Sequence, residues 1–215
     1  MPFDGGYLHK ISQEISACAG ARIDKISQPG RELVVLTLRG SGANKKLLLS
    51  ADATAPKVHF TTQSLENPKA APMFCMLLRK HLGSGKLLRV EQQGLDRVLR
   101  LVFETVNELG DRGETSLICE IMGRHSNIIL VDHQGKIIDA AKRVDFVTSE
   151  VRQVLPGMAY APPPAQAKKS LLDLSPRELA GAILAGRDAP LWKAVLEQAE
   201  GLSPLDRKSP RLNSS

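Results

Sequence analysis

The segment EIMGRHSNIILVD, residues 120–132, carries charged side chains that its local structure does not require. Its pattern predicts a strand, a tight polar turn and a second strand, and the glycine, serine and asparagine of the turn are sufficient to form it. Arg124 and His125 are therefore free for another role, such as donating hydrogen bonds to an anion or a base. Glu120 lies in a strand with apolar side chains on both faces, which is typical of a central strand. A carboxylate there must either be paired, with Arg124 as the candidate partner, or act as a recessed hydrogen-bond acceptor, because burying it alone is costly.

A second charged pair stands at the start of another predicted strand. In GLDRVLRLVFE, residues 94–104, Arg97 shares the more apolar face with Leu95 and Leu99, because successive side chains of a strand alternate between its faces. Either Arg97 reaches water from the rim of the sheet, or Asp96 and Arg97 are presented together from the strand end to a ligand. The pattern leaves both interpretations open.

Basic residues cluster around the end of a predicted helix and the strand that follows it. Such a cluster usually forms a solvated face, but it becomes a phosphate-binding surface if these strand ends converge with Arg97 and Arg124. The candidate phosphate contacts are Arg79, Lys80, Lys86 and Arg89.

Motifs of catalysis and metal binding are weak in this sequence. HLGSGKL, residues 81–87, resembles a phosphate-binding loop, but Leu87 stands where a metal-binding Ser or Thr is needed. The five histidines are scattered and none lies four residues from another, so we expect no metal site and no cofactor. Pro2, after removal of the initiator methionine, would present a secondary amine of the kind that forms Schiff bases with aldehydic sugars. The sequence offers no nearby acid to assist it, so we interpret Pro2 as the residue before a helix.

Composition narrows the class of protein. Hydrophobic residues make up 42% of the 215, which is enough for a packed core. Lys and Arg number 29 against 23 Asp and Glu, a net charge of +6 that favours an anionic partner such as nucleic acid. The three cysteines are far apart and predict reduced thiols. No apolar run approaches the length of a membrane span or a signal peptide, so we expect a cytoplasmic protein with no membrane partner.

The first 155 residues predict an α+β domain. Helical spacing predicts helices over residues 3–19 and 72–82, each followed by a glycine. Between and after them, apolar runs separated by turn residues predict strands, including a hairpin that turns at Pro29–Gly30 and a longer turn over residues 107–113. Consecutive strands joined by short turns predict an antiparallel curled sheet or sandwich with packed helices.

The composition changes after residue 155. Three consecutive prolines and a polar run predict a linker over residues 156–170. Two short helices follow within residues 171–205, each preceded by a capping residue and a proline: Ser175 before the first and Asp188 before the second. Residues 206–215 lose all periodicity, and we expect them to be a tail foreign to the protein, at the end of a fragment.

Together these segments resemble the NFACT family. The resemblance is carried by FDGGYLHKISQEI near the start, ENPKAAPMFCMLLRKHL, GLDR, EIMGRHSNIILVD and the late GLSP, in this order along residues 1–205. It implies an N-terminal domain similar in fold to formamidopyrimidine-DNA glycosylases, followed by a helix–two-turns–helix unit at 171–205. It also implies further regions beyond this chain that grip the ribosome and bind RNA.

The resemblance implies a function without catalytic residues. Family members bind large ribosomal subunits obstructed by peptidyl-tRNA and recruit alanyl-tRNA, and the ribosome itself then adds a template-free alanine tail. The family's Asp-Arg pair falls on Asp96 and Arg97, and its N-terminal aspartate on Asp4. By the same resemblance, the strand end and turn within residues 120–125 would contribute the rest of the tRNA-contacting surface, namely Glu120, Ile121, Met122, Arg124 and His125.

Two other functions compete with this one. A DNA glycosylase or lyase would use Pro2, but Phe3 stands where those enzymes have a glutamate, and no zinc finger is present in the sequence. A name used within the family suggests a surface adhesin that binds fibronectin. The free cysteines and the lack of a signal peptide argue against an adhesin.

Overall fold

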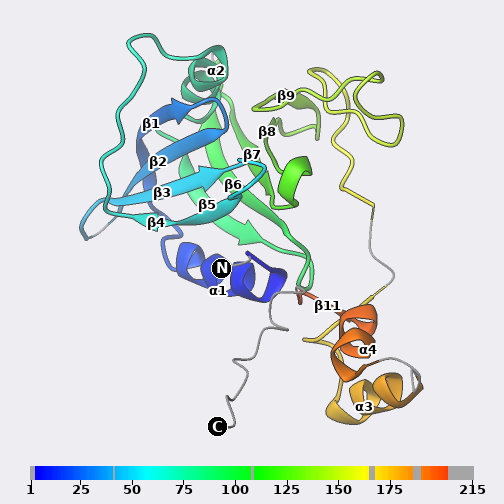
Figure 1. Ribbon diagram of the computed structural model, residues 1–215. Coiled ribbons are helices and arrows are strands. Elements are labelled where there is room, and N and C mark those ends of the chain that lie inside the picture. The colour runs from blue at the N-terminus through cyan, green and yellow to red at the C-terminus, as the bar shows by residue number, and fades with distance from the viewer. Residues whose placement is uncertain (1–2, 41, 108, 165–167, 186–189, 203–215) are drawn as a thin grey trace, which may run out of the picture.

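The computed structural model describes residues 3–40, 42–107, 109–164, 168–185 and 190–202 (Figure 1). Pro2, Asp188 and the tail 206–215 lie outside these residues, so the expectations attached to them stay untested. The described chain consists of a curled sheet with two helices packed on it and a small helical unit (Figure 1). The predicted α+β class with a large antiparallel sheet is confirmed.

One nine-stranded antiparallel sheet forms the body of the molecule, in the order β4-β3-β2-β1-β5-β6-β7-β8-β9. Every neighbouring pair is antiparallel, and the order departs from chain order only in that β1 has both β2 and β5 as neighbours. The strands are β1 (Arg22–Gly30), β2 (Leu33–Arg39), β3 (Lys45–Ser50), β4 (Lys57–Thr61), β5 (Lys86–Glu91), β6 (Val98–Val106), β7 (Arg112–Glu120), β8 (Asn127–Val131) and β9 (Ile137–Ala140).

Two helices cover the sheet. α1 (Gly5–Ser16) buries Leu8, Ile11 and Ile15 at helical spacing, and α2 (Met73–Leu82) buries its own apolar stripe. Both pack into the main core with the inward side chains of the strands, where alternate residues of β2 are fully buried. In Figure 1, α1 lies below the curled sheet and α2 above it.

A second, smaller core lies on the other face of β7–β9. Ile118, Ile129 and Ile137 pack there against Val154 and Tyr160 of the following segment. β7 is therefore covered on both faces, which explains why its apolar residues do not alternate with polar ones. The segment 152–161 is bound to this face, with Val144 paired to Val154 and Lys136 to Ala159. The first part of the predicted linker thus packs against the sheet.

The positions of two turns predicted from the sequence are wrong. The β1–β2 turn is at Arg31–Glu32, because Gly30 still pairs with Leu33. β7 begins at Arg112, inside the segment expected to be a turn, because the β6–β7 ladder extends to the pair Val106 and Arg112.

The helical unit comprises α3 (Pro176–Ala185) and α4 (Leu191–Gln198), with β10 (Lys169–Ser170) and β11 (Ala199–Glu200) paired in parallel. The predicted cap at Ser175 is confirmed: its Oγ accepts a hydrogen bond from the amide of Glu178, whose carboxylate accepts one from the amide of Ser175. The unit contacts the body where the Gly6 amide donates to the Gly201 carbonyl at 3.2 Å.

Candidate nucleic-acid interface

The β-ladder brings two separated motifs together. Val98, the first residue of β6, lies opposite Glu120, the last residue of β7. One residue further out, the amide of Ile121 donates to the carbonyl of Arg97 at 2.8 Å. The Asp96–Arg97 pair and the Glu120–Met122 segment therefore meet at one end of the β6–β7 hairpin, as the candidate site requires.

The start of α1 reaches the same corner. Asp4 is the N-cap of this helix and its Oδ1 accepts from the amide of Tyr7 at 2.8 Å. Gln92 ties the two segments, since its Nε2 donates to the carbonyl of Gly5 at 3.1 Å and to that of Asp96 at 2.7 Å. A Cβ on Gly5 would lie 1.7 Å from the carbonyl oxygen of Leu95, so only glycine permits this approach. We call Asp4, Asp96 and Arg97 the acidic–arginine corner.

Charged groups at this corner are available to a ligand. Arg97 is half-buried, and its guanidinium makes no hydrogen bond or ion pair with any residue that the structure describes. Asp96 uses one carboxylate oxygen to accept from the Arg97 amide at 2.7 Å. A forked donor beside carboxylate acceptors can bind a phosphate, a base edge or a ribose hydroxyl. Of the two interpretations of Arg97, presentation at a strand end fits this geometry.

Glu120 is buried and paired, but its partner is not Arg124. Its carboxylate is 1% exposed and accepts from Arg152 at 2.6 and 3.0 Å and from the hydroxyl of Tyr160 at 3.0 Å. Burial raises the pKa of Tyr160, and the charge of Glu120 raises it further. The prediction that Arg124 pairs with Glu120 is wrong, because Arg124 projects from the turn into solvent. Glu120 therefore holds the end of β7 in place and has no exposed oxygen to offer a ligand.

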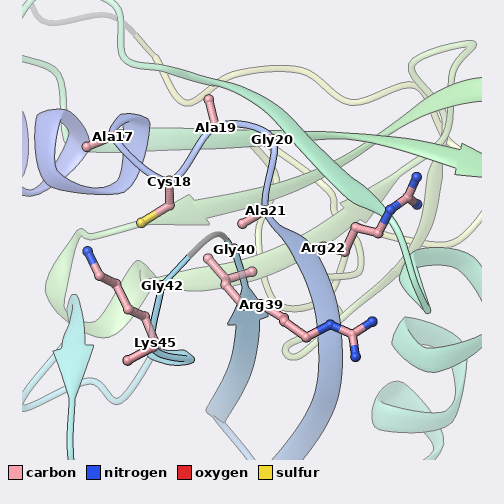
Figure 2. Close-up of a pocket in the computed structure, with 12 residues that line it drawn as sticks. Ala17, Cys18, Ala19, Gly20, Ala21, Arg22, Arg39, Gly40, Gly42 and Lys45 are labelled. Carbon is pink, nitrogen blue, oxygen red and sulfur yellow. The ribbon is translucent and has the colours of Figure 1, made fainter.

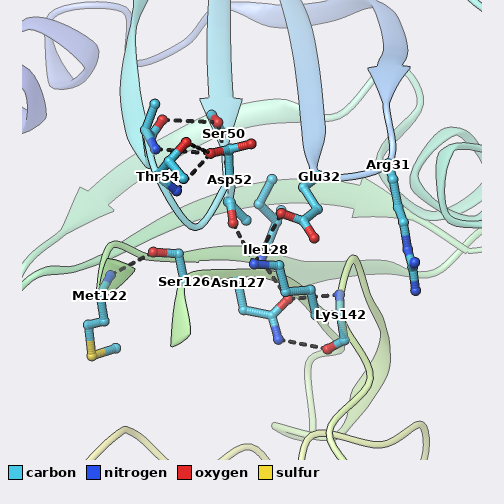
Figure 3. Close-up of polar contacts among 12 residues, drawn as sticks. Arg31, Glu32, Ser50, Asp52, Thr54, Met122, Ser126, Asn127, Ile128 and Lys142 are labelled. Atoms are coloured by element: carbon cyan, nitrogen blue, oxygen red, sulfur yellow. Dashed lines mark hydrogen bonds and ion pairs between the residues drawn. The ribbon is translucent and has the colours of Figure 1, made fainter. Parts of the chain in front are cut away.

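Two buried polar side chains, Ser126 and Asn127, hold the turn after Glu120 in place through hydrogen bonds to the backbone. In Figure 3 the hydroxyl of Ser126 accepts from the Met122 amide, at 2.8 Å. Asn127 clamps the backbone of Lys142, with its side chain donating to the carbonyl at 2.8 Å and accepting from the amide at 3.0 Å (Figure 3). Ser126 and Asn127 are both buried, so they hold the turn from beneath.

The exposed part of this turn is basic. Arg124 and His125 lie in the short 3₁₀ helix η1 (Gly123–His125), with Arg124 Nε 3.0 Å from His125 Nε2. Met122 is half-buried, whereas Ile121 is 2% exposed and belongs to the main core. Of the predicted contact residues in this segment, Met122, Arg124 and His125 can reach a ligand, and Ile121 and Glu120 can act only through them.

The basic cluster does not converge with this corner. Lys86 lies opposite Glu104, six residues along β6 from Val98, or about 20 Å at roughly 3.3 Å per residue. Arg89 is neutralised by Glu91 at 2.7 Å and by a forked contact to Glu114 at 2.8 Å, which raise its pKa. Lys86 and Arg89 therefore do not meet the condition for a phosphate-binding surface shared with Arg97.

The two remaining members of that cluster lie on α2. Arg79 donates through its Nε to the carbonyl of Ile26 at 3.0 Å. Lys80 is exposed in the last turn of the helix.

Three supporting residues were missed. Tyr160 lies in the segment expected to be a linker, and Arg152 lies just before it. Gln92 directly follows β5. One signal was present, since Tyr160 is one of only two tyrosines and stands next to a proline run. Arg152 had no signal, because its partner is 32 residues away.

The described residues contain no group of three or more His, Cys, Asp and Glu side chains placed to hold a metal ion. Cys75 and Cys119 are buried, and burial raises the pKa of both thiols. Among the helices that the structure describes, none is long and apolar enough to cross a membrane.

Residues 4–209 match a family model described as NFACT N-terminal and middle domains. The chain is 42% identical over 210 residues to the Rqc2 homolog RqcH of Bacillus subtilis, covering 97% of this chain and 37% of that protein. It is 31% identical over 158 residues to the archaeal Rqc2 homolog aRqcH of Methanocaldococcus jannaschii, covering 72% of this chain and 22% of that protein. The chain thus spans little more than a third of the RqcH relative.

Solved structures agree with the fold. The N-terminal domain of the fibronectin-binding protein PavA of Streptococcus pneumoniae superimposes with a TM-score of 0.86 at 34% identity, covering 94% of this chain and 75% of that one. The fibrinogen-binding protein of Staphylococcus aureus superimposes with a TM-score of 0.85 at 32% identity, covering 96% and 73%.

Proposed function

Because this chain belongs to the NFACT family, whose named relatives include Rqc2 homologs, we propose that it is the tRNA-recruiting region of a ribosome quality-control factor. The factor binds large ribosomal subunits obstructed by peptidyl-tRNA in the cytoplasm and brings alanyl-tRNA to them. The ribosome forms the peptide bonds of the resulting alanine tail. This chain needs no catalytic residue or cofactor for that role.

The observation that carries the proposal is the acidic–arginine corner. The guanidinium of Arg97, which has no partner among the described residues, and the carboxylates of Asp4 and Asp96 lie at one end of the β6–β7 hairpin. Asp4 is far from the other two in the sequence. Arg97 binds a phosphate or base edge, and the carboxylates accept from base amino groups or ribose hydroxyls. Met122, Arg124 and His125 extend the contact from the neighbouring turn.

Two finer features of the fold belong to this proposal. The sheet domain is similar in fold to formamidopyrimidine-DNA glycosylases, and residues 171–205 form a helix–two-turns–helix unit. We expect no glycosylase reaction, because Phe3 stands where those enzymes have a glutamate. Its ring packs edge-on against Tyr7, with 4.9 Å between ring centroids.

The test is the double substitution Asp96→Ala with Arg97→Ala in a full-length protein that contains this region. Losing two charged contacts, each worth about 1 kcal/mol or more, should reduce tRNA co-purification roughly 30-fold or more and abolish alanine tailing. Sedimentation with large subunits should persist, and the melting temperature should change little.

The chain supplies a matched control for this test. Asp111 and Arg112 form the same dipeptide at the opposite end of the β6–β7 hairpin, and both are exposed. Asp111→Ala with Arg112→Ala should leave tRNA recruitment unchanged. Normal tailing by the Asp96/Arg97 variant would place the tRNA site elsewhere, and its unfolding would make these residues structural.

The name of one similar protein, the fibronectin-binding protein PavA, suggests a second candidate function, binding of fibronectin. It predicts that the purified chain binds immobilised fibronectin and that the Asp96/Arg97 variant binds it equally well. Absence of binding removes this candidate.

A further inference from the structure

The outer face of the sheet carries a row of cations that the acidic–arginine corner does not use. Arg39 of β2 lies directly opposite Arg22 of β1, and Arg22 lies directly opposite Lys86 of β5. Residues opposite each other in a ladder share one face, so these three side chains stand side by side across three adjacent strands. The next pair on that face, beside Thr37, is Lys25 and Lys46. We call Arg22, Lys25, Arg39, Lys46 and Lys86 the basic face.

Little on this face compensates the positive charge. Asp24 approaches Arg39 at 3.6 Å, and both side chains are well exposed, at 40% and 65%. Arg22 donates to the carbonyl of Ser84 at 3.1 Å and forms no ion pair with a residue in the described ranges. Glu104 lies directly opposite Lys86, and its carboxylate is also 3.8 Å from Arg112. The five cations of the basic face therefore adjoin two carboxylates, Asp24 and Glu104.

This arrangement is unfavourable for folding by itself. Like charges directly opposite each other on neighbouring strands destabilise a sheet, and here two such contacts adjoin. The β1 register shifts between Ile23 and Lys25, and the shift turns Lys25 to the outer face instead of the core. A bound polyanion would remove the repulsion.

A hollow of about 650 Å³ adjoins this row, between the C-terminal end of α1 and the β2–β3 hairpin. Figure 2 shows Arg22 and Arg39 extending in the same direction from neighbouring strands, with Lys45 on the other side of the hollow. None of the described residues that line this hollow is aromatic, so the hollow and the basic face are suited to a phosphate backbone and not to stacked bases.

We propose that the basic face binds the phosphate backbone of a helical arm of the tRNA whose other part lies at the acidic–arginine corner. α1 connects the two places: Asp4 caps its first turn, and Arg22 follows soon after its last. Its 12 residues span about 18 Å at roughly 1.5 Å per residue. One folded RNA can cover that distance. This inference rests on the proposed function for its choice of RNA.

The test uses two probes, a tRNA transcript and a plain RNA duplex of about two helical turns, titrated against the protein at several salt concentrations. Arg22→Gln with Arg39→Gln should weaken binding of both probes about tenfold at low salt, and should reduce the slope of log affinity against log salt by roughly two. Because repulsion is relieved, the melting temperature should stay the same or rise.

Two further variants make the result specific. Arg177→Gln with Lys193→Gln removes the same charge from α3 and α4 and should leave affinity and slope unchanged. Asp96→Ala with Arg97→Ala should weaken tRNA binding but leave duplex binding intact, so failure of the proposed function is distinguishable from failure of the basic face.

Wild-type affinity and slope in the Arg22/Arg39 variant would overturn the inference. So would full competition by polyglutamate at equal charge, since the face would then bind acidic protein, or equal loss in the Arg177/Lys193 variant, since only net charge would then matter.

Discussion

At the scale of single residues, the carboxylate of Glu120 changes the interpretation of its motif. The sequence motif suggests that Glu120 contacts the RNA directly. Arg152 and Tyr160, however, donate hydrogen bonds to its carboxylate oxygens, and the residue is almost completely buried. Its effect on a bound RNA must pass through Met122 and the exposed turn. Arg152 and Tyr160 are therefore positioning residues of the same surface.

We predict that Arg152→Ala lowers the free energy of unfolding by about 3 kcal/mol, because it leaves a buried carboxylate without its cation. Urea titration measures this. Glu120→Ala with Arg152→Ala should cost clearly less than the sum of the two single changes, with a coupling of about 1–3 kcal/mol. Arg124→Ala is the control and should stay within about 0.5 kcal/mol. Additive costs for the pair, or a large cost at Arg124, would contradict this assignment.

At the scale of elements, the helical unit is coupled to the corner through two hydrogen bonds, one from its backbone and one from the side chain of Glu200. Glu200 of β11 accepts from the amide of Leu95 at 3.3 Å, and the carbonyl of Gly201 accepts from the amide of Gly6 at 3.2 Å. Both contacts adjoin residues of the acidic–arginine corner. Docking of the unit therefore helps to fix the Asp96 loop.

We predict that Gly201→Ala undocks the helical unit. Gly201 has φ +88°, and its Cβ would lie 2.6 Å from the Cβ of Leu95. Hydrogen exchange at the Gly6 amide should accelerate roughly tenfold or more, while the strands of the sheet keep their protection. Gly110 is a matched control, with φ +88° but no atom near its Cβ, so Gly110→Ala should carry only the backbone strain. Unchanged exchange at Gly6 in the Gly201 variant would show that the docking tolerates a side chain.

At the scale of the whole molecule, the sheet curls until distant strands meet. The ammonium of Lys142, just after β9, donates to the carbonyl of Ala51 after β3 at 2.6 Å and lies 3.1 Å from Glu32 in the β1–β2 turn (Figure 3). Asn127 fixes the backbone of Lys142. This clamp joins the two halves of the sheet beside the Met122–His125 turn.

We predict that Lys142→Ala lowers the unfolding free energy by about 2 kcal/mol, since the buried carbonyl of Ala51 loses its donor. Calorimetry should show a melting temperature lower by roughly 4–8 °C. As a control, Lys193→Ala removes an exposed ion pair with Glu197 and should change the melting temperature by no more than about 2 °C. An equally small change at Lys142 would mean that the clamp contributes nothing.

The sequence by itself determined the elements and the candidate residues. Alternating and helical spacing predicted the strands and both packed helices, because burial of an apolar stripe is encoded locally. The capping box at Ser175 could also be read directly, since its two residues are three apart. Motif residues such as Asp96, Arg97 and Glu120 were likewise visible as charges that the local pattern did not require.

Only the tertiary structure decided which charged side chains can contact a ligand. Glu120 and Arg97 lie in similar positions at strand ends. Glu120 forms a two-point ion pair with Arg152, whereas the guanidinium of Arg97 has no side-chain partner in the described chain. Likewise, the sequence left open whether Lys86 lies near Arg97, and strand pairing places it beside Arg22 instead. The reason is physical: local pattern fixes the face on which a side chain lies, whereas strand pairing and chain closure over many residues fix its neighbours and the solvent it reaches.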